Sequence, residues 1–440
     1  MVLRLVFVRH GLISFNQKGI VQGRSNDSYL TKEGYEQAES AGKVLNGINF
    51  DAIYSSPLIR ASETANTIEK CFKKNYEIHL DENLLEVNLE KWSGFTIDEI
   101  KNKYPDDYLN WKNDPENLIL KNKDNNNYQP IKDLYIQAKR FTDYLFLNYK
   151  SEEETNILII AHNAILRCII LSLIKRPRKG FRKIKLDNAS ISIINIQKNK
   201  ALINSQIECI NQTSHLGKNI PSKIGKSRII MVRHGETDWN KEGRFQGQID
   251  IPLNENGKIQ AKQASEYLKE ISFNKAYSSS MVRPFETAKI ILDNDLKINK
   301  IDNLKEISHG LWEGKLEKEI KAKWPKLLDD WHHTPENVIM PEGESIREVA
   351  KRSISAWESI CAAQEDNDIT LLVAHDAVNK TLICHMLGLE FSNIWMIKQG
   401  NGGITVIDIF NDPKKDNVIS SLNITNHLGS ILDPTAKGAL

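Results

Sequence analysis

The chain carries the same ordered set of short motifs twice, and this internal repeat limits its possible folds more than any other feature. The order of the matched segments never breaks, and the spacing between partners only shrinks along the chain. The pairs are Phe7–Gly11 with Met231–Gly235, Val21–Gly23 with Phe245–Gly247, Tyr54–Ala65 with Tyr277–Ala288, Pro115–Asn117 with Pro335–Asn337, Ala161–His162 with Ala374–His375, and His215–Gly217 with His427–Gly429. The pattern indicates a duplication, followed by small deletions in the second copy or insertions in the first.

The repeat predicts two tandem domains. A chain of 440 residues is long for one domain and sufficient for two, each with its own core. We place the first copy at 1–215 and the second at 228–440. Residues 216–227 are rich in Gly, Ser, Pro and Lys and lack periodicity, so they are the predicted linker. A polar run at 121–127 occurs in the first copy only and is predicted to be a surface loop.

Within each copy, segments of strand type alternate with segments of helix type. Residues 4–8 and 157–161 of the first copy are short apolar runs, as are residues 228–232 and 369–374 of the second. Pro57, directly after Ser56, suits the first turn of a helix with a serine cap. The alternation predicts an α/β class: two three-layer α/β/α domains, each with a mainly parallel sheet and helices on both faces. In such sheets, ligands bind at the carboxyl ends of the strands.

Composition excludes several other classes. The formal net charge of +2 is too small for a nucleic-acid binder that relies on bulk charge. The five cysteines are isolated, with no Cys-x-x-Cys spacing, which fits a reducing compartment. The longest apolar stretches are too short or too charged for a membrane span, and the N-terminus does not resemble a signal peptide. We therefore expect a cytoplasmic protein without a nucleic-acid or membrane partner. Its oligomeric state is left open.

Two pairs of histidines stand at the ends of predicted strands. They are His10 with His234, and His162 with His375. One such histidine usually has a structural role, but two at equivalent strand ends, each duplicated, indicate a functional site. The third pair, His215 with His427, follows no identifiable strand end and is interpreted as structural.

The residues around these histidines match the needs of phosphoryl transfer. A neutral imidazole can attack phosphorus, arginine forks bind phosphoryl oxygens, and a carboxylic acid can protonate the leaving oxygen. The second copy supplies these groups in the order Arg233, His234, Arg283, Glu306 and His375. The first copy supplies Arg9, His10, Arg60, Glu86 and His162 in the same order.

Other chemistries fit the sequence less well. Neither His-x-His nor HExxH is present, and no G-x-S-x-G elbow, P-loop or G-x-G-x-x-G is found. The serines at 278–280 are interpreted as a tight turn and helix cap rather than as nucleophiles. We expect neither a metal nor another cofactor.

At these residues the chain resembles the histidine phosphatase superfamily, in its phosphoglycerate-mutase-like branch. The second copy has the fuller signature Arg233-His234-Gly235-Glu236-Thr237-Asp238-Trp239-Asn240, and the likeness covers nearly the whole chain. The resemblance implies that His234 is the phosphorylated nucleophile and Glu306 the proton donor. It further implies a phosphate pocket of Arg233, Asn240, Arg283 and His375, and a helical insert over the site at about 313–345.

The same resemblance extends to the first copy, with His10 and Glu86 in the catalytic positions. The implied phosphate-binding residues there are Arg9, Asn16, Arg60 and His162. The neighbourhood departs from the family pattern, because Leu12 and Ile13 stand where the second copy has Glu236 and Thr237. Glu90 replaces Gly310, and Ser93 replaces Glu313. We expect this copy to bind phosphate but to turn over slowly, or to act on a different substrate.

The segments Gly310–Gly314 and Pro341–Ser345 are similar to those of broad small-substrate phosphatases and α-ribazole phosphatases. The basic lid motif of the cofactor-dependent mutases is missing. We therefore favour hydrolysis of a small phosphorylated metabolite. The alternatives are a cofactor-dependent phosphoglycerate mutase, a phospho-ligand-binding regulatory protein with inactive sites, and a tandem that serves packing alone.

Overall fold

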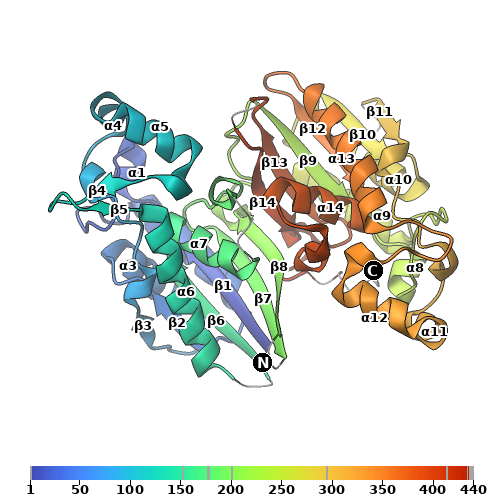
Figure 1. Cartoon of the computed structure of the whole chain (residues 1–440), viewed down its shortest axis with the longest axis horizontal. Coiled ribbons are helices and arrows are strands. Elements are labelled where there is room, and N and C mark those ends of the chain that lie inside the picture. The colour runs from blue at the N-terminus through green and yellow to red at the C-terminus, as the bar shows by residue number, and fades with distance from the viewer. Residues whose placement is uncertain are drawn as a thin grey trace. The chain divides into compact units, whose positions relative to one another are not determined.

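The computed structural model describes residues 2–150, 153–175, 179–199, 202–293, 296–412, 415–433 and 435. The chain divides into two compact units, Met1–Pro221 and Ser222–Leu440, and each is described by itself. Each unit has a sheet with helices on both faces, as predicted (Figure 1). None of the helices in these described ranges has both the length and the apolar character needed to cross a bilayer.

The first unit is built on the sheet order β8-β7-β1-β6-β2-β3. The parallel strands are β1 (Val2–Arg9), β6 (Glu154–Ala161), β2 (Ala52–Ser55) and β3 (Ile78–Leu80). β7 (Ile191–Asn199) pairs antiparallel with β1 and with β8 (Leu202–Gln212). The apolar stretches of β1 (residues 5–8) and of β6 (residues 157–161) are buried throughout, as expected for strands covered on both faces.

The second unit repeats this order as β11-β10-β12-β9-β13-β14. The parallel strands are β9 (Ser227–Arg233), β12 (Ile369–Ala374), β10 (Lys275–Ser279) and β11 (Ile298–Ile301). β13 (Ile404–Ile409) pairs antiparallel with β9 and with β14 (Val418–Ile424). Because β9 and β12 are adjacent, Arg233-His234 and His375 leave the sheet side by side.

The main helices follow the strands. In the first unit they are α1 (Ser14–Lys18), α2 (Lys32–Leu45), α3 (Ile59–Glu69), α6 (Pro130–Asn148) and α7 (Asn163–Leu173). Their counterparts are α8 (Asp238–Glu242), α9 (Glu255–Leu268), α10 (Val282–Leu292), α13 (Ile346–Ala362) and α14 (Asp376–Leu387). α2 packs on α3 and α6 on α7, and the same pairing recurs for α9 with α10 and α13 with α14.

The predicted insert at 313–345 contains two helices, α11 (Glu317–Lys323) and α12 (Pro325–His333). The first unit has the equivalent α4 (Ile97–Lys103) and α5 (Pro105–Asn113). Trp331 of α12 is completely buried. A proline at the start of α5 and of α12 fits the first turn of a helix, where its missing N–H costs no hydrogen bond.

Two local predictions were wrong. α3 begins at Ile59 with Leu58 at its N-cap, and Ser56 does not cap it, because its hydroxyl contacts His162 and the N–H of Leu58 rather than an N–H within the helix. The polar run at 121–127 is not a simple loop. Its ends pair as β4 (Leu120–Lys121) and β5 (Asn127–Tyr128), so it forms a small hairpin.

Candidate active site

The second unit brings its predicted residues together at the carboxyl edge of the sheet. His234 directly follows β9, His375 directly follows β12, and their ring centroids lie 5.1 Å apart. Arg283 reaches them from the first turn of α10 and is completely buried. The site is therefore assembled from two adjacent strand ends and one helix start, as the strand-end pattern predicted.

His234 is held in one orientation and one protonation state. Its Nδ1 lies 2.7 Å from the carbonyl oxygen of Gly235, and Arg283 donates from Nε to its Nε2 at 3.2 Å. Since arginine can only donate, Nε2 is the acceptor and the ring proton is on Nδ1. Burial and the charges of Arg283 and Arg233 hold the pKa of His234 well below its usual value, so the imidazole is neutral at pH 7.

Two arginines and a second histidine lie near Nε2 of His234. Arg283 is fixed by its own hydrogen bond to the carbonyl of Gly247, and Arg233 by one to the carbonyl of Gln399. The Nε atom of Arg233 and the Nδ1 atom of His375 are buried and make no hydrogen bond within the described residues. These groups can bind the oxygens of a phosphoryl group.

His375 is oriented by Ser279 at the end of β10. Its Nε2 lies 2.9 Å from the Ser279 hydroxyl. Burial and the charge of Arg283 hold the pKa of His375 well below the usual value as well. The imidazole is neutral, and its Nδ1 has no hydrogen-bond partner among the residues that the structure describes.

Glu306 is buried beside the same cluster. Its carboxylate accepts hydrogen bonds from the backbone N–H groups of Ile307 (3.0 Å) and of Asp376 (3.0 Å) at the start of α14. Burial first, and then the negative charge of Asp376, raise the pKa of Glu306 above its usual value. A carboxyl group with a raised pKa suits a role as proton donor.

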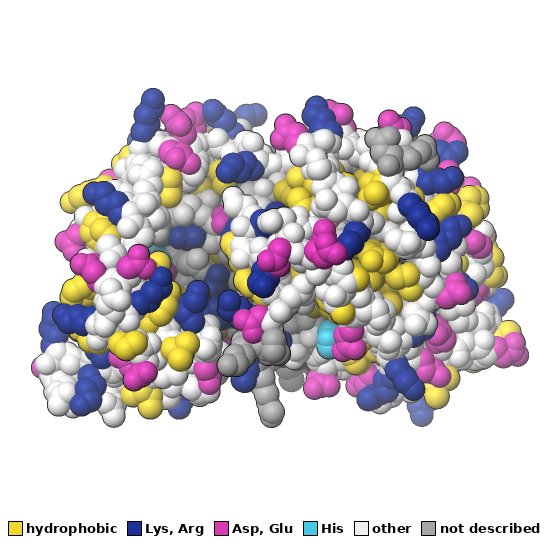
Figure 2. Space-filling view, turned by 90° about the horizontal axis from the view of Figure 1, so that it is seen from above, with side chains coloured by type: hydrophobic (Ala, Val, Ile, Leu, Met, Phe, Trp, Pro, Cys, Tyr) yellow, Lys and Arg dark blue, Asp and Glu magenta, His cyan; other side chains and the backbone are white. Residues whose placement is uncertain are grey.

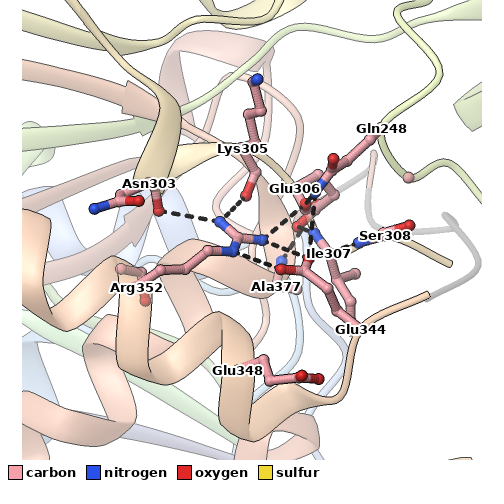
Figure 3. Close-up of polar contacts among 12 residues, drawn as sticks. Gln248, Asn303, Lys305, Glu306, Ile307, Ser308, Glu344, Glu348, Arg352 and Ala377 are labelled. Atoms are coloured by element: carbon pink, nitrogen blue, oxygen red, sulfur yellow. Dashed lines mark hydrogen bonds and ion pairs between the residues drawn. The ribbon is translucent and has the colours of Figure 1, made fainter. Parts of the chain in front are cut away.

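The segment that carries Glu306 is held by a network of side chains (Figure 3). Arg352 of α13 donates to the carbonyl oxygens of Lys305 and Glu306, at 2.5 and 2.9 Å, and pairs with Glu344 at 2.8 Å. Gln248 also donates to the carbonyl of Glu306, at 3.0 Å. The acid is thus positioned through its own backbone.

The first unit repeats this arrangement but changes the contact of its arginine. The rings of His10 and His162 also lie 5.1 Å apart, and Nδ1 of His10 lies 2.8 Å from the carbonyl of Gly11. Arg60, however, donates from Nε to Nδ1 of His162 rather than to His10. Glu86 accepts from the backbone N–H of Ala164 at the start of α7, as Glu306 does at α14.

Asn240 and Asn16 hold equivalent positions near His234 and His10, but the contacts that support them differ. Asn240 forms a capping box with Thr237 at the start of α8. Ile13 occupies the Thr237 position in the first unit, so α1 has no side-chain cap and Asn16 loses this contact. The side-chain oxygen of Asn16 keeps a hydrogen bond from Asn188.

The sequence analysis missed a second asparagine in each site. Asn401 donates to the backbone oxygen of His234 and to Asn240, both at 3.2 Å. Asn188 does the same for His10 and Asn16, at 3.0 and 3.3 Å. Each asparagine directly precedes a residue whose carbonyl binds a histidine of the third pair. His215 binds the carbonyl of Ala189, and His427 binds that of Gly402. The structural interpretation of that third pair therefore fits the contacts.

Comparison with known proteins agrees with this arrangement. The family model described as histidine phosphatase superfamily (branch 1) matches residues 5–207 and again residues 229–423. The chain belongs to the histidine phosphatase superfamily. It holds two tandem copies of the domain, as the repeat predicted.

Relatives in this superfamily include named phosphatases. A 2-carboxy-D-arabinitol-1-phosphatase from Triticum aestivum is 25% identical, over 99% of this chain and 88% of that protein. Phosphoserine phosphatase 1 from Hydrogenobacter thermophilus is 34% identical, over 46% of this chain and 94% of that protein. A solved α-ribazole phosphatase from Shigella flexneri is 25% identical, with a TM-score of 0.42 over 45% of this chain and 96% of that one. The family and the first two of these relatives together support a phosphatase enzyme.

Proposed function

We propose that the chain hydrolyses small phosphomonoesters through a phosphohistidine intermediate, without a metal or other cofactor. The observation that carries this proposal is the neutral His234, whose acceptor atom Nε2 lies against Arg283 and beside the neutral His375. An imidazole held in this tautomer is a nucleophile toward phosphorus, and the nearby arginines match the charge that develops on the phosphoryl oxygens.

The proposed reaction has two steps. Nε2 of His234 forms a bond to phosphorus, the bond from phosphorus to the ester oxygen breaks, and protonated Glu306 gives its proton to the departing alkoxide. Water then attacks the phosphohistidine, and Glu306 takes a proton from that water as the N–P bond breaks. The products are an alcohol and inorganic phosphate, and both His234 and Glu306 return to their starting states.

The substrate proposal is a small phosphorylated metabolite. The relatives named after phosphoserine and 2-carboxy-D-arabinitol 1-phosphate support this class. We propose hydrolysis in preference to phosphoglycerate mutase activity, because the chain lacks the basic lid motif of the mutases. Neither a nucleic acid nor a membrane is part of the proposal.

Labelling the intermediate tests the nucleophile. Substrate labelled in its phosphate should transfer acid-labile, base-stable phosphate to His234 of the full chain, and His234→Ala should remove that label together with the activity of the second copy. Activity should survive a chelator and fall with vanadate, which imitates five-coordinate phosphorus. Label that persists unchanged when His234→Ala is added to a His10→Ala chain, or strict dependence on added magnesium, would show the proposed mechanism to be wrong.

For the first copy we propose weaker or altered activity with His10 as nucleophile and Glu86 as acid. Its Arg60 binds His162, so Nε2 of His10 lacks the arginine contact that His234 has. Separate His10→Ala and His234→Ala chains rank the copies on a panel of phosphoglycerates, phosphoserine, sugar phosphates and α-ribazole phosphate. The ranking is wrong if His10→Ala removes half or more of the turnover of the best substrate.

A further inference from the structure

The first unit has a cavity of about 320 Å³ beside His10, and its walls are unusually rich in arginine. It is small for a ligand site, so it suits a compact molecule. The arginines that line it are Arg9, Arg60, Arg167 and Arg182. Among the described lining residues, Glu86 is the one carboxylate. The space-filling view shows Lys and Arg side chains around a hollow in the surface (Figure 2).

Two of these arginines, Arg167 and Arg182, lie outside the proposed phosphate pocket. Arg182 donates to the backbone oxygen of Trp111 at 2.5 Å, and Arg167 donates to that of Phe181 at 3.4 Å. Both guanidinium groups also lie over aromatic rings, 4.9 Å from Trp111 for Arg182 and 5.4 Å from Phe181 for Arg167. The Nε atoms of both arginines are buried and have no hydrogen-bond partner in the described part of the chain.

The second copy treats the same positions differently. Lys380 occupies the Arg167 position in α14, and its ammonium group pairs with Asp376 at 2.6 Å. Trp395 occupies the Arg182 position and donates to the backbone of Trp331 at 3.0 Å, as Arg182 does to Trp111. The second copy therefore has an acid-paired lysine and an indole at the two positions where the first copy has guanidinium groups.

The acid that neutralises Lys380 is itself missing from the first copy. Asn163 stands at the Asp376 position and donates to the backbone oxygen of Leu186. The charged groups that act on Arg167 include Arg182, Arg9 and Glu86, and the first two repel it. Burial lowers the pKa of Arg167 to about 9 and that of Arg182 to about 10, so both are charged at pH 7.

The charges of the cavity exceed those of one phosphate. A phosphoryl dianion balances Arg9 and Arg60, and the Glu86 carboxylate accepts hydrogen bonds from the backbone N–H groups of Ala164 and Ile165. Arg167 and Arg182 then remain as two adjacent, half-buried cations with buried Nε atoms, an arrangement that an anion bound between them would stabilise. Arginine forks bind carboxylates and phosphates in the same bidentate geometry.

We propose that the first copy is specific for phosphomonoesters that carry a second anionic group, a carboxylate or a second phosphate, which Arg167 and Arg182 bind. This inference rests on the proposed function, because it names the substrate class of that same site. It also gives a reason for the difference between the two copies beyond the phosphate, because the second copy has Asp376 and Trp395 where the first has Asn163 and Arg182.

Three matched two-carbon esters test the proposal in the full chain carrying His234→Ala, so that turnover comes from the first copy. They are phosphoglycolate, ethylene glycol bisphosphate and ethylene glycol monophosphate, which has no second anion. We expect kcat/KM for at least one of the first two esters to exceed that of the monophosphate by about tenfold or more, the effect of one charge-assisted contact. The preferred ester shows whether a carboxylate or a phosphate is the second anion.

Variants that introduce residues of the second copy provide the matched controls. The measured ratio is kcat/KM for the preferred ester with a second anion divided by kcat/KM for the monophosphate. Arg182→Trp and Asn163→Asp should each lower this ratio toward one, whereas Arg182→Lys should keep part of it. A ratio near one in the parent chain, or a high ratio that survives Arg182→Trp, would overturn the inference.

The failure of the proposed function gives a different result. If the His234→Ala chain hydrolyses none of the esters, binding to the His10→Ala, His234→Ala chain is measured by calorimetry. Phosphoglycolate binding that Arg182→Trp weakens about tenfold or more supports the anion site without hydrolysis. Equal binding of phosphoglycolate and the monophosphate, insensitive to Arg182→Trp, overturns the anion site itself.

Discussion

Arg283 donates a hydrogen bond from Nε to Nε2 of His234, whereas its counterpart Arg60 donates to Nδ1 of His162. The two contacts are equal in length, 3.2 Å, but differ in the imidazole they reach. In the second copy the guanidinium group lies against the proposed attacking atom, where it would contact the phosphoryl group during transfer. In the first copy it reaches the second imidazole, so His10 has a different set of donors. This difference and the contacts around Glu306 lead to distinct expectations for the two copies.

Replacement of the proposed acid should depend on the leaving group. Glu306→Gln keeps the shape but cannot give a proton, so alkyl phosphates should slow by about 100-fold or more, the range of general acid catalysis. p-Nitrophenyl phosphate should slow far less, because its leaving group needs little protonation. The comparison uses kcat/KM of both esters in a His10→Ala chain. Equal loss on both esters would mean that Glu306 positions the substrate instead.

Asp376 should set the pH range of the second copy. Its negative charge raises the pKa of Glu306, and the reaction needs Glu306 protonated. Asp376→Asn removes that charge but leaves the effect of burial, so the pKa of Glu306 falls and the alkaline limb of the kcat/KM profile moves to lower pH. The first copy has Asn163 at this position and provides the natural reference. An alkaline limb that stays in place would assign it to another group.

His309 should make the second unit less stable in acid. Both of its ring nitrogens are buried without a partner among the described residues, and burial lowers its pKa to about 3. A histidine with a lowered folded pKa stabilises the fold above the unfolded value of about 6.5. That stability is lost as the pH falls from there toward 3, because the unfolded chain takes up the proton first.

The substitution His309→Leu tests this, since Leu89 stands at the same position in the first copy. As the pH falls from 7 to 5, the unfolding free energy of the parent should decrease by about 2 kcal/mol more than that of the variant. The figure follows from about 1.36 kcal/mol per pH unit for one proton taken up by the unfolded chain alone. Urea unfolding at the two pH values measures the difference. The same pH dependence in variant and parent would contradict a buried neutral imidazole.

Arg352 should stabilise the segment that presents Glu306. Arg352→Gln removes its bonds to the Lys305 and Glu306 carbonyls and leaves Glu344 without its ion pair. We expect a loss of about 1–3 kcal/mol in unfolding free energy, because two backbone carbonyls and the half-buried Glu344 lose their partner, together with a fall in kcat. Adding Glu344→Gln should restore part of the stability, because the first copy has Gln129 at that position. Denaturant unfolding and single-ester kinetics check both effects, and a double variant no more stable than the single one would contradict the ion pair's role.

The sequence predicted the fold class and the strand-end histidines because their signals are local. Apolar runs that end in Arg-His or Ala-His mark buried parallel strands, and the repeat doubled the evidence for each position. Ser56 was assigned wrongly as a helix cap, since its partner His162 lies about a hundred residues further along the chain. Asn188 and Asn401 were missed for the same reason, although their equal place in the two copies was a usable signal.

The sequence shows which charges differ between the copies, but it does not show that they line one cavity. The pairing of Lys380 with Asp376 one helical turn away is a local pattern, and its replacement by Arg167 and Asn163 is visible in the printed sequence. That these positions face the same cavity as His10 depends on how α7 meets the segment around Arg182, and only the fold shows it.

The side chains that hold the backbone around Glu306 and Glu86 limit how the two copies can be recombined. In the second copy the guanidinium comes from α13, as Arg352, and the amide from the loop, as Gln248. In the first copy the roles are exchanged: Arg24 of the loop donates to the Glu86 carbonyl, and Gln137 of α6 donates to the carbonyl of Leu85. A chimera that joins the loop of one copy to the helix of the other would bring together either two guanidinium groups or none. The loop and the helix of one copy therefore cannot be exchanged separately with those of the other, even though both pairs of side chains hold the same backbone segment.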